Sequence, residues 1–302
     1  MSVFIGIDGG GTRSTLLAID ETGAPLVRAE GGPAIVDPAD PARRAEPLGQ
    51  LVTAALERLG VSGPADGLCC ALAGVGRPAE RATLGAALAA RGLARHVHVI
   101  ADAEAALQDA FGDGPGVLAI SGTGSAVWAR GQTGRMLRVG GWGLVLGDEG
   151  SGYAIGLAGL RAVLRSHDGR MATTALTDAV LASLDLTSPD DLVRWTALAS
   201  KREVAATAPL VLDRPDDPAA AAIIEAAAAE LADQVETAAR LLDPWSGRVP
   251  VALSGGLISP GRAFRAPVLR SLEAVPHAYR VHQDVVDAAR GAALIARARH
   301  RA

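Results

Sequence analysis

Short apolar runs alternate with longer amphipathic stretches over the first third of the chain. Runs of period two predict strands, and apolar positions at helical spacing predict helices. The expected order is three strands, a helix, a strand, a helix and a strand, near Val3, Leu16 and Leu26 and then over residues 47–59, 67–73, 79–91 and 96–101. Such alternation is typical of an α/β fold.

A second cycle follows, with strands expected at residues 116–121, 125–129 and 136–139, then a long helical region and a strand at 249–253. Both cycles open with an apolar strand that enters a Gly- and Thr-rich turn, IGIDGGGT and then LAISGTGS. A duplicated fold that holds a nucleotide between its halves would produce this echo, and so would coincidence. The turn-rich run GDGPG predicts a boundary between domains 1–112 and 113–302.

The first turn has the composition of a phosphate-binding loop. Gly9, Gly10 and Gly11 lack a Cβ, so they can adopt positive φ and turn N–H donors toward one anion, and Thr12 adds a hydroxyl. Asp8 could hold Mg²⁺ through water. The alternative is a glycine-rich hairpin that binds nothing.

Two better-known glycine loops are excluded. A P-loop ends in Gly-Lys-Ser/Thr, but the only lysine of the chain is Lys201. The dinucleotide fingerprint fails because Ser14 stands where its third glycine belongs. The segment after the loop is another strand rather than a helix. A third glycine pair, Gly255 and Gly256, follows a third apolar strand, VALSGGLI.

Composition limits the classes of partner. The 302 residues are 49% hydrophobic and 21% charged, with a net charge of −4, and show no basic cluster for nucleic acid. No apolar run is long enough for a membrane span, and no charged-then-apolar leader opens the chain, so the cytoplasm is the expected compartment. The only cysteines, Cys69 and Cys70, are adjacent, which excludes a disulfide framework or a Cys-rich metal site within one chain.

Four motifs in order carry a resemblance to a family: DGGGT, an Asp at a strand end before SGTGS, GGWGLVLGDEGSG, and SGG. Together they resemble the N-acetylglucosamine kinase and BadF/BadG-type ATPase family, which belongs to the sugar-kinase, chaperone and actin superfamily. The resemblance extends from Val3 to the closing DAARGAAL. It implies two ribonuclease-H-like α/β domains, as in actin-like ATPases, around an ATP cleft, with the last helix, about residues 285–300, packed back on the N-terminal domain.

The same resemblance implies how ATP is bound. Two loops would bind the phosphates, and a third loop and a helix would contact the adenosine. The implied residues are Gly10, Gly11 and Thr12, then Gly122, Thr123 and Gly124 for the phosphates, and Ala205, Gly255 and Gly256 for the adenosine. For Ala205, core packing is an equal explanation.

Asp102 stands where the family places its catalytic base, which takes the proton of the attacking sugar hydroxyl. The alternative is that Asp102 is only the N-cap of a helix over residues 103–111.

A sugar site is implied around GGWGLVLGDEGSG. The family implies contacts from Asp148, from the backbone near Gly141 and Trp142, from Gly124 and Ser125, and from Asp102 itself. The alternative is a turn in which Asp148 caps the helix over residues 152–166 and Trp142 fills the core.

One position departs from the family pattern. An Asn is expected early in the chain, but Ile35 follows the turn and the sequence contains no Asn. The prediction is therefore an ATP- and Mg²⁺-dependent kinase of an amino sugar such as N-acetylglucosamine or glucosamine, acting at the 6-hydroxyl as a homodimer. The alternatives are an ATPase or sugar sensor of the same fold without kinase turnover, and an activator ATPase with an iron–sulfur cluster, for which the cysteines have the wrong context.

Overall fold

The first glycine loop joins two strands. β1 (Phe4–Gly9) pairs antiparallel with β2 (Ser14–Ile19), which pairs antiparallel with β3 (Pro25–Gly31). On the other side of β1 lie β4 (Gly67–Leu72) and β5 (Val97–Ala101), both parallel to it. The order β3-β2-β1-β4-β5 therefore places the carboxyl ends of β1, β4 and β5 at one edge of the sheet.

The computed structural model describes residues 2–11, 13–34, 39–75 and 77–300. The chain divides into two compact units. Unit 1 comprises Met1–Asp113 and Val286–Ala302, and unit 2 comprises Gly114–Val285.

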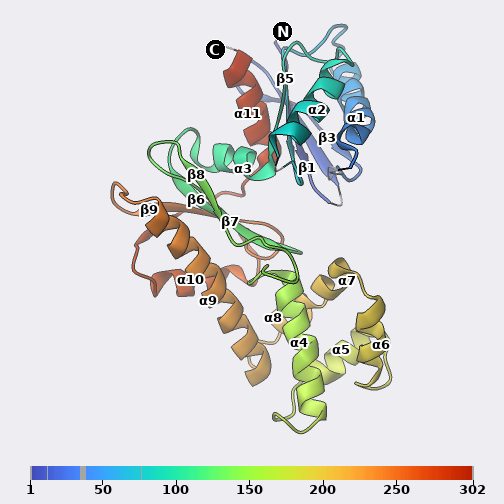
Figure 1. Ribbon diagram of the computed structural model, residues 1–302, viewed down its shortest axis with the longest axis vertical. Helices are drawn as coiled ribbons and strands as arrows, with labels where there is room; N and C mark the ends of the chain where they lie inside the picture. The colour runs from blue at the N-terminus through green and yellow to red at the C-terminus, as the bar shows by residue number, and fades with distance from the viewer. Residues whose placement is uncertain (1, 12, 35–38, 76, 301–302) are drawn as a thin grey trace. The chain divides into compact units, whose positions relative to one another are not determined.

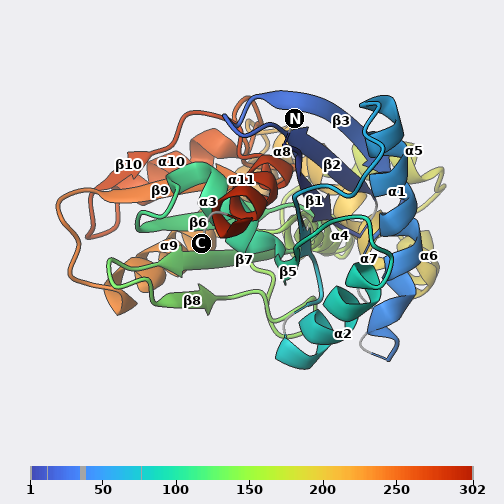
Figure 2. The ribbon, with the colours of Figure 1, turned by 90° about the horizontal axis from the view of Figure 1, so that it is seen from above.

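Helices cover both faces of the sheet in unit 1 (Figure 2). Side chains alternate along β4, so Leu68 and Cys70 pack with the helices of one face, and Cys69 and Ala71 with those of the other. The first face carries η1 (Pro41–Arg44), α1 (Ala45–Arg58) and α2 (Pro78–Ala89), and the second carries α3 (Asp102–Phe111) and α11 (Ala288–His300).

The two cysteines are buried, unpaired thiols on opposite faces of β4. Burial raises the pKa of Cys69 to about 12 and raises the pKa of Cys70 further. They cannot act together as ligands of one metal, as expected from their adjacency.

The backbone of α11 packs closely against the backbone of β1. Its inner side is almost all alanine, and Ala289, Ala292 and Ala293 are fully buried. A Cβ at Gly6 of β1 would collide with the backbone of α11 at Ala289 and Ala293. The last helix of the chain is therefore an integral layer of unit 1.

The sheet of unit 2 repeats the topology of the first. β6 pairs antiparallel with β7 and β7 with β8, while β9 and β10 lie parallel on the other side of β6. The order is β10-β9-β6-β7-β8, with β6 (Gly116–Ser121), β7 (Ser125–Arg130), β8 (Met136–Val139), β9 (Val249–Ser254) and β10 (Tyr279–Val281). The predicted α/β class with two similar sheets is confirmed, although the three-residue strand β10 was not expected.

The long helical region consists of six helices, and α9 forms the core of unit 2. α9 packs on β6, β7 and β8 and also contacts α4, α8 and α10 (Figure 1). The helices of this unit are α4 (Gly152–His167), α5 (Leu176–Leu184), α6 (Asp191–Leu198), α7 (Lys201–Ala206), α8 (Ala208–Leu212), α9 (Pro218–Leu241) and α10 (Arg265–Glu273). Within the described parts of the chain, no helix is both long and apolar enough to cross a membrane.

Candidate active site

Two carboxylates stand at the carboxyl edge of the sheet in unit 1. Asp8 is the fifth residue of β1, and Asp102 follows the last residue of β5. Since β1, β4 and β5 are parallel, both side chains arise at the same edge. Asp102 and Asp287 are the two acids that act most strongly on the charge of Asp8.

The pKa of Asp8 responds to the two neighbouring carboxylates. Burial, and then the charges of Asp102 and Asp287, raises the pKa of Asp8 to about 6, against the opposing effect of Arg13 and Arg28. Burial also raises the pKa of Asp102, while a hydrogen bond from the Ala103 N–H to its Oδ1 at 2.8 Å opposes the shift. A raised pKa suits a carboxylate that must accept a proton near neutral pH.

Asp8 fits a water-mediated Mg²⁺ ligand. Its partly buried carboxylate lies near two more acids, so a cation there would be stabilised. Among the residues that the structure describes, no three His, Cys, Asp or Glu side chains are placed to hold a metal ion together. Mg²⁺ usually retains several waters and takes one or two carboxylates plus phosphate oxygens, so the residues present fit a hydrated ion on a nucleotide.

The first glycine loop is a tight hairpin closed by a hydrogen bond from the Gly10 N–H to the Arg13 carbonyl at 3.0 Å. The expected positive φ is not found at Gly9 or Gly10. At Gly9 the reason for glycine is packing, because a Cβ would collide with Leu72. Gly11 is exposed. Thr12, the predicted phosphate ligand, and Ile35, which stands where the family pattern has Asn, lie outside the described residues.

Asp102 is not the N-cap of its helix, which corrects the structural alternative. Ala101 occupies the N-cap position, and Asp102 is the first residue of α3. The capping contact comes from Glu104, whose Oε1 accepts from the Ala101 N–H at 3.2 Å. Arg81 holds Glu104 in turn, with its guanidinium 2.7 Å from Oε1, and donates to the Val75 carbonyl at 2.8 Å. The backbone that carries Asp102 is thus fixed by other side chains.

The second and third glycine loops meet in unit 2. Gly122, Thr123 and Gly124 form the β6–β7 turn, and the start of α4 donates to it from the Gly152 N–H to the Gly122 carbonyl at 2.7 Å. Gly255 has φ +100°, and a Cβ there would collide with the Ser121 carbonyl.

Two more predicted adenosine residues lie at these loops. A Cβ built at Gly122 would stand 3.8 Å from the Gly256 nitrogen, and one at Gly152 would stand 3.5 Å from the Cβ of Ala205. The predicted phosphate and adenosine residues of unit 2 therefore form one neighbourhood.

The predicted sugar residues adjoin the same turn. The Ser125 hydroxyl donates to the Glu149 carbonyl at 2.6 Å, which holds the segment around Asp148 against β7. A Cβ at Gly124 would stand 3.2 Å from the Asp148 Oδ2, and a Cβ at Gly141 would stand 2.8 Å from Ala126 of β7. Gly124, Ser125, Gly141 and Asp148 are therefore brought together.

Both structural alternatives for this segment are wrong. Ser151, not Asp148, is the N-cap of α4, since its hydroxyl accepts from the Ala154 N–H at 3.1 Å. Trp142 does not fill the core: it is 65% exposed, with the Arg138 guanidinium 4.8 Å from its ring centroid. The exposed indole is available for ligand contact, whereas Asp148 is buried.

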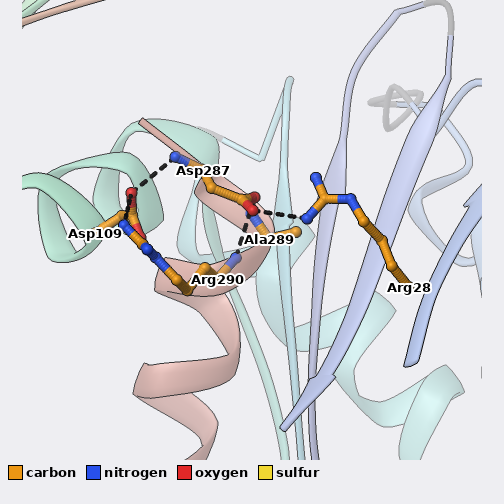
Figure 3. Close-up of polar contacts among 5 residues, drawn as sticks. All are labelled: Arg28, Asp109, Asp287, Ala289 and Arg290. Atoms are coloured by element: carbon orange, nitrogen blue, oxygen red, sulfur yellow. Dashed lines mark hydrogen bonds and ion pairs between the residues drawn. The ribbon is translucent and has the colours of Figure 1, made fainter. Parts of the chain in front are cut away.

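Sequence reasoning missed Lys201 and Asp287. The Lys201 Nζ lies 2.5 Å from the Asp148 Oδ2. Asp287 accepts from Arg28 at 2.7 Å and from the Ala289 N–H at 3.1 Å, so it joins β3 to the start of α11 (Figure 3). Its own N–H donates to Asp109 of α3. The single lysine was visible in the sequence, but its partner was not.

Known proteins resemble the chain over most of its length. It is 31% identical over 264 residues to an N-acetylmuramic acid/N-acetylglucosamine kinase of Clostridium acetobutylicum, covering 86% of each chain. An N-acetyl-D-glucosamine kinase of Dictyostelium discoideum is 31% identical over 205 residues, 64% of each chain. The crystal structure of a candidate N-acetylglucosamine kinase from Chromobacterium violaceum superposes with a TM-score of 0.77 at 29% identity, covering 98% of this chain and 99% of that one.

The fold also matches a ROK family glucokinase from Streptomyces griseus, with a TM-score of 0.58 at 18% identity, over 98% of this chain and 100% of the glucokinase. The model of the BadF/BadG/BcrA/BcrD ATPase family matches residues 5–296. The resemblance inferred from the four motifs is thereby confirmed, and the chain belongs to the BadF/BadG/BcrA/BcrD ATPase family.

Proposed function

We propose that the protein is an ATP-dependent kinase that transfers the γ-phosphoryl group to a hydroxyl of an amino sugar, such as N-acetylglucosamine or glucosamine. The observation that carries this proposal is the position of Asp102, a partly buried carboxylate with a raised pKa that shares a sheet edge with Asp8. The names of the two curated relatives, both amino sugar kinases, support it. The primary 6-hydroxyl is the proposed acceptor.

Asp102 would accept the proton of the attacking hydroxyl as the oxygen approaches the γ-phosphorus, which is worth about 10²–10⁴ in rate. Asp8 would hold Mg²⁺ through water, and bound Mg²⁺ would neutralise charge on the phosphate oxygens. Backbone N–H groups of Gly10, Gly11 and the turn 122–124 would cradle the phosphates, as predicted from the sequence.

For the acceptor, Asp148 would take hydrogen bonds from sugar hydroxyls, with Ser125 and the backbone at Gly141 and Trp142 beside it. Ala205, Gly255 and Gly256 would lie against the adenosine. A homodimer remains a prediction from the resemblance, and a cytoplasmic location remains a prediction from the sequence.

The test is release of ADP from Mg²⁺-ATP in the presence of glucosamine, N-acetylglucosamine, N-acetylmuramate, N-acetylmannosamine or glucose. We expect at least one amino sugar to stimulate ADP release at least tenfold over the sugar-free rate, with one phosphorylated sugar formed per ADP. ADP release at the same slow rate with every sugar would contradict the proposal and favour an ATPase or a sensor.

A further inference from the structure

Lys201 is the only lysine of the chain, and its ammonium is directed at the proposed sugar site. Its Nζ lies 2.5 Å from the Asp148 Oδ2. The Asp148 side chain is 5% exposed, while that of Lys201 is 32% exposed. The pair is thus buried on the acid side and partly exposed on the lysine side.

The local backbone fixes both members of the pair. Lys201 is the first residue of α7, which begins with a capping box: the Ser200 hydroxyl accepts from the Glu203 N–H, and the Glu203 carboxylate accepts from the Ser200 N–H at 2.7 Å. Asp148 has φ +63°, and its carbonyl accepts from the Ser151 N–H at the start of α4. Both side chains therefore extend from backbone that local hydrogen bonds hold in place.

The absence of a side chain at Gly124 lets the pair pack close to the β6–β7 turn. A Cβ at this position would stand 3.1 Å from the Lys201 Nζ and 3.2 Å from the Asp148 Oδ2. Such contacts are tighter than nearly all real Cβ contacts, so the pair faces bare backbone of the β6–β7 turn. This turn also carries the proposed phosphate ligands.

The chemistry of the pair matches a sugar. An ammonium has three N–H donors, and a carboxylate has about four acceptor sites, so one mutual hydrogen bond leaves most of both free. Two hydroxyls on neighbouring carbons can accept from the ammonium and donate to the carboxylate at once. We propose that Lys201 is a positioning and specificity-determining residue for the acceptor sugar, acting with Asp148 on two adjacent hydroxyls. This proposal rests on the proposed function.

A purely structural lysine would behave differently. If Lys201 only balanced the buried charge of Asp148, its removal would lower stability and would change the sugar KM through Asp148 alone, by the same factor whichever hydroxyl of the sugar is missing. A lysine that binds the sugar loses a hydrogen bond to one particular hydroxyl, so in its absence the removal of that hydroxyl raises the sugar KM little further.

The experiment compares Lys201→Met, Lys201→Arg and the matched control Arg202→Met, whose native side chain is the exposed neighbour on α7. We expect Lys201→Met to raise the sugar KM by about 10–100-fold, with kcat and the KM for ATP within about threefold of the parent. Lys201→Arg should recover part of the loss because the charge remains. Arg202→Met should resemble the parent.

Deoxy sugars identify the contact itself. With the parent enzyme, removing one of the two adjacent hydroxyls should raise the sugar KM. With Lys201→Met, the KM for that deoxy analogue should be little higher than the KM for the intact sugar, because the substitution and the missing hydroxyl remove the same hydrogen bond. If the two losses multiply for every monodeoxy analogue, the ammonium does not contact the sugar.

The outcomes separate this proposal from the proposed function. A folded Lys201→Met variant with the parental sugar KM overturns the role of Lys201 and leaves the kinase intact. A parent protein that no sugar stimulates overturns both. If Lys201→Met does not fold, acetic anhydride labelling of the parent, read by peptide mass spectrometry at Lys201, replaces it: saturating sugar should slow acetylation at least fivefold, and an unchanged rate refutes the proposal.

Discussion

Gly291 of α11 lies against the backbone of Ala105 of α3 so closely that a Cβ at Gly291 would collide with the Ala105 carbonyl oxygen. The two helices cover one face of the sheet in unit 1, and α3 ends just before unit 2 in the sequence while α11 begins just after it. Close backbone packing between α3 and α11 therefore holds the C-terminal helix in the same unit as the N-terminal segment.

Gly291→Ala should destabilise the protein by about 1–3 kcal/mol, because the helices must separate to admit the methyl group. The control is Gly85→Ala in α2, where the new Cβ would make only an ordinary 3.7 Å contact with Val99. That change should be neutral or stabilising by up to about 1 kcal/mol, since alanine is the better helix former. All four tryptophans lie in unit 2, so calorimetry is preferred to fluorescence. Equal transition temperatures for both variants would refute this packing.

Asp8→Asn should stabilise the protein in the absence of metal. Its pKa of about 6 in the folded state lies above its ordinary value of 3.8, so the ionised form is unfavourable in the folded protein and the stability of the parent falls as pH rises from about 4 to about 6. We expect the variant to gain about 1–2 kcal/mol at pH 8 and nothing at pH 4. Urea denaturation with EDTA measures this gain, and a gain that persists at pH 4 would contradict the cause. In the kinase assay the same variant should need more Mg²⁺.

His277 should make the stability of unit 2 depend on pH. It lies between two acids, with its Nδ1 2.7 Å from the Glu236 Oε1 of α9 and its Nε2 3.2 Å from the Asp243 Oδ1. The hydrogen bond to Glu236, and then that to Asp243, raises the pKa of His277 above 6.5 in spite of partial burial. Because the folded pKa is the higher one, the stabilisation is complete below pH 6.5 and is lost as pH rises through the folded pKa.

His277→Gln should therefore destabilise the protein by about 1 kcal/mol at pH 6 and by less at pH 9. Tyr279→Phe is the control, because it removes the hydroxyl that donates to Glu236 at 2.8 Å. This hydroxyl does not titrate between pH 6 and pH 9, because burial raises the pKa of Tyr279 above its ordinary value of 10. The loss in the free energy of unfolding caused by Tyr279→Phe should be the same at both pH values. Chemical denaturation gives both numbers, and a pH-independent cost for His277→Gln would exclude a charged histidine.

Substitution by alanine should have different effects on stability at Gly255 and at Gly256. Gly255 has φ +100° and no room for a Cβ, whereas a Cβ at Gly256 would have nothing within 4 Å. Gly255→Ala should cost stability by about 1–3 kcal/mol. Gly256→Ala should leave the transition temperature unchanged and raise the KM for ATP, because the methyl group would enter the space proposed for the adenosine. An unchanged KM for ATP in Gly256→Ala would remove that loop from the nucleotide site.

The sequence predicted local features well, because they depend on local patterns. The strands of both cycles and the strand–turn–strand form of the first two glycine loops followed from apolar runs and turn residues. The roles of individual glycines followed less well: Gly9 is required by Leu72 rather than by its own φ. The short strand β10 was missed because three residues carry too little periodicity.

Contacts between distant residues could not be predicted. Arg28 and Asp287 are 259 positions apart, and nothing local to either indicates that α11 begins beside β3. Lys201 and Asp148 are separated by 53 residues and several helices. The exposure of Trp142 likewise depends on how the turn 140–147 lies over β7 and β8, since an aromatic residue in a glycine-rich segment is compatible with core or surface.

The central claim is that Asp102 is the base of an amino sugar kinase, and Asp102→Asn tests it most directly. The Asn side chain has nearly the same size as Asp and can still accept the hydrogen bond from the Ala103 N–H, but it cannot accept a proton from the sugar hydroxyl. We predict an unchanged transition temperature and formation of phosphorylated sugar slowed about a hundredfold or more relative to the parent, measured with saturating Mg²⁺-ATP and the best sugar of the panel. Turnover within a few-fold of the parent would contradict the account.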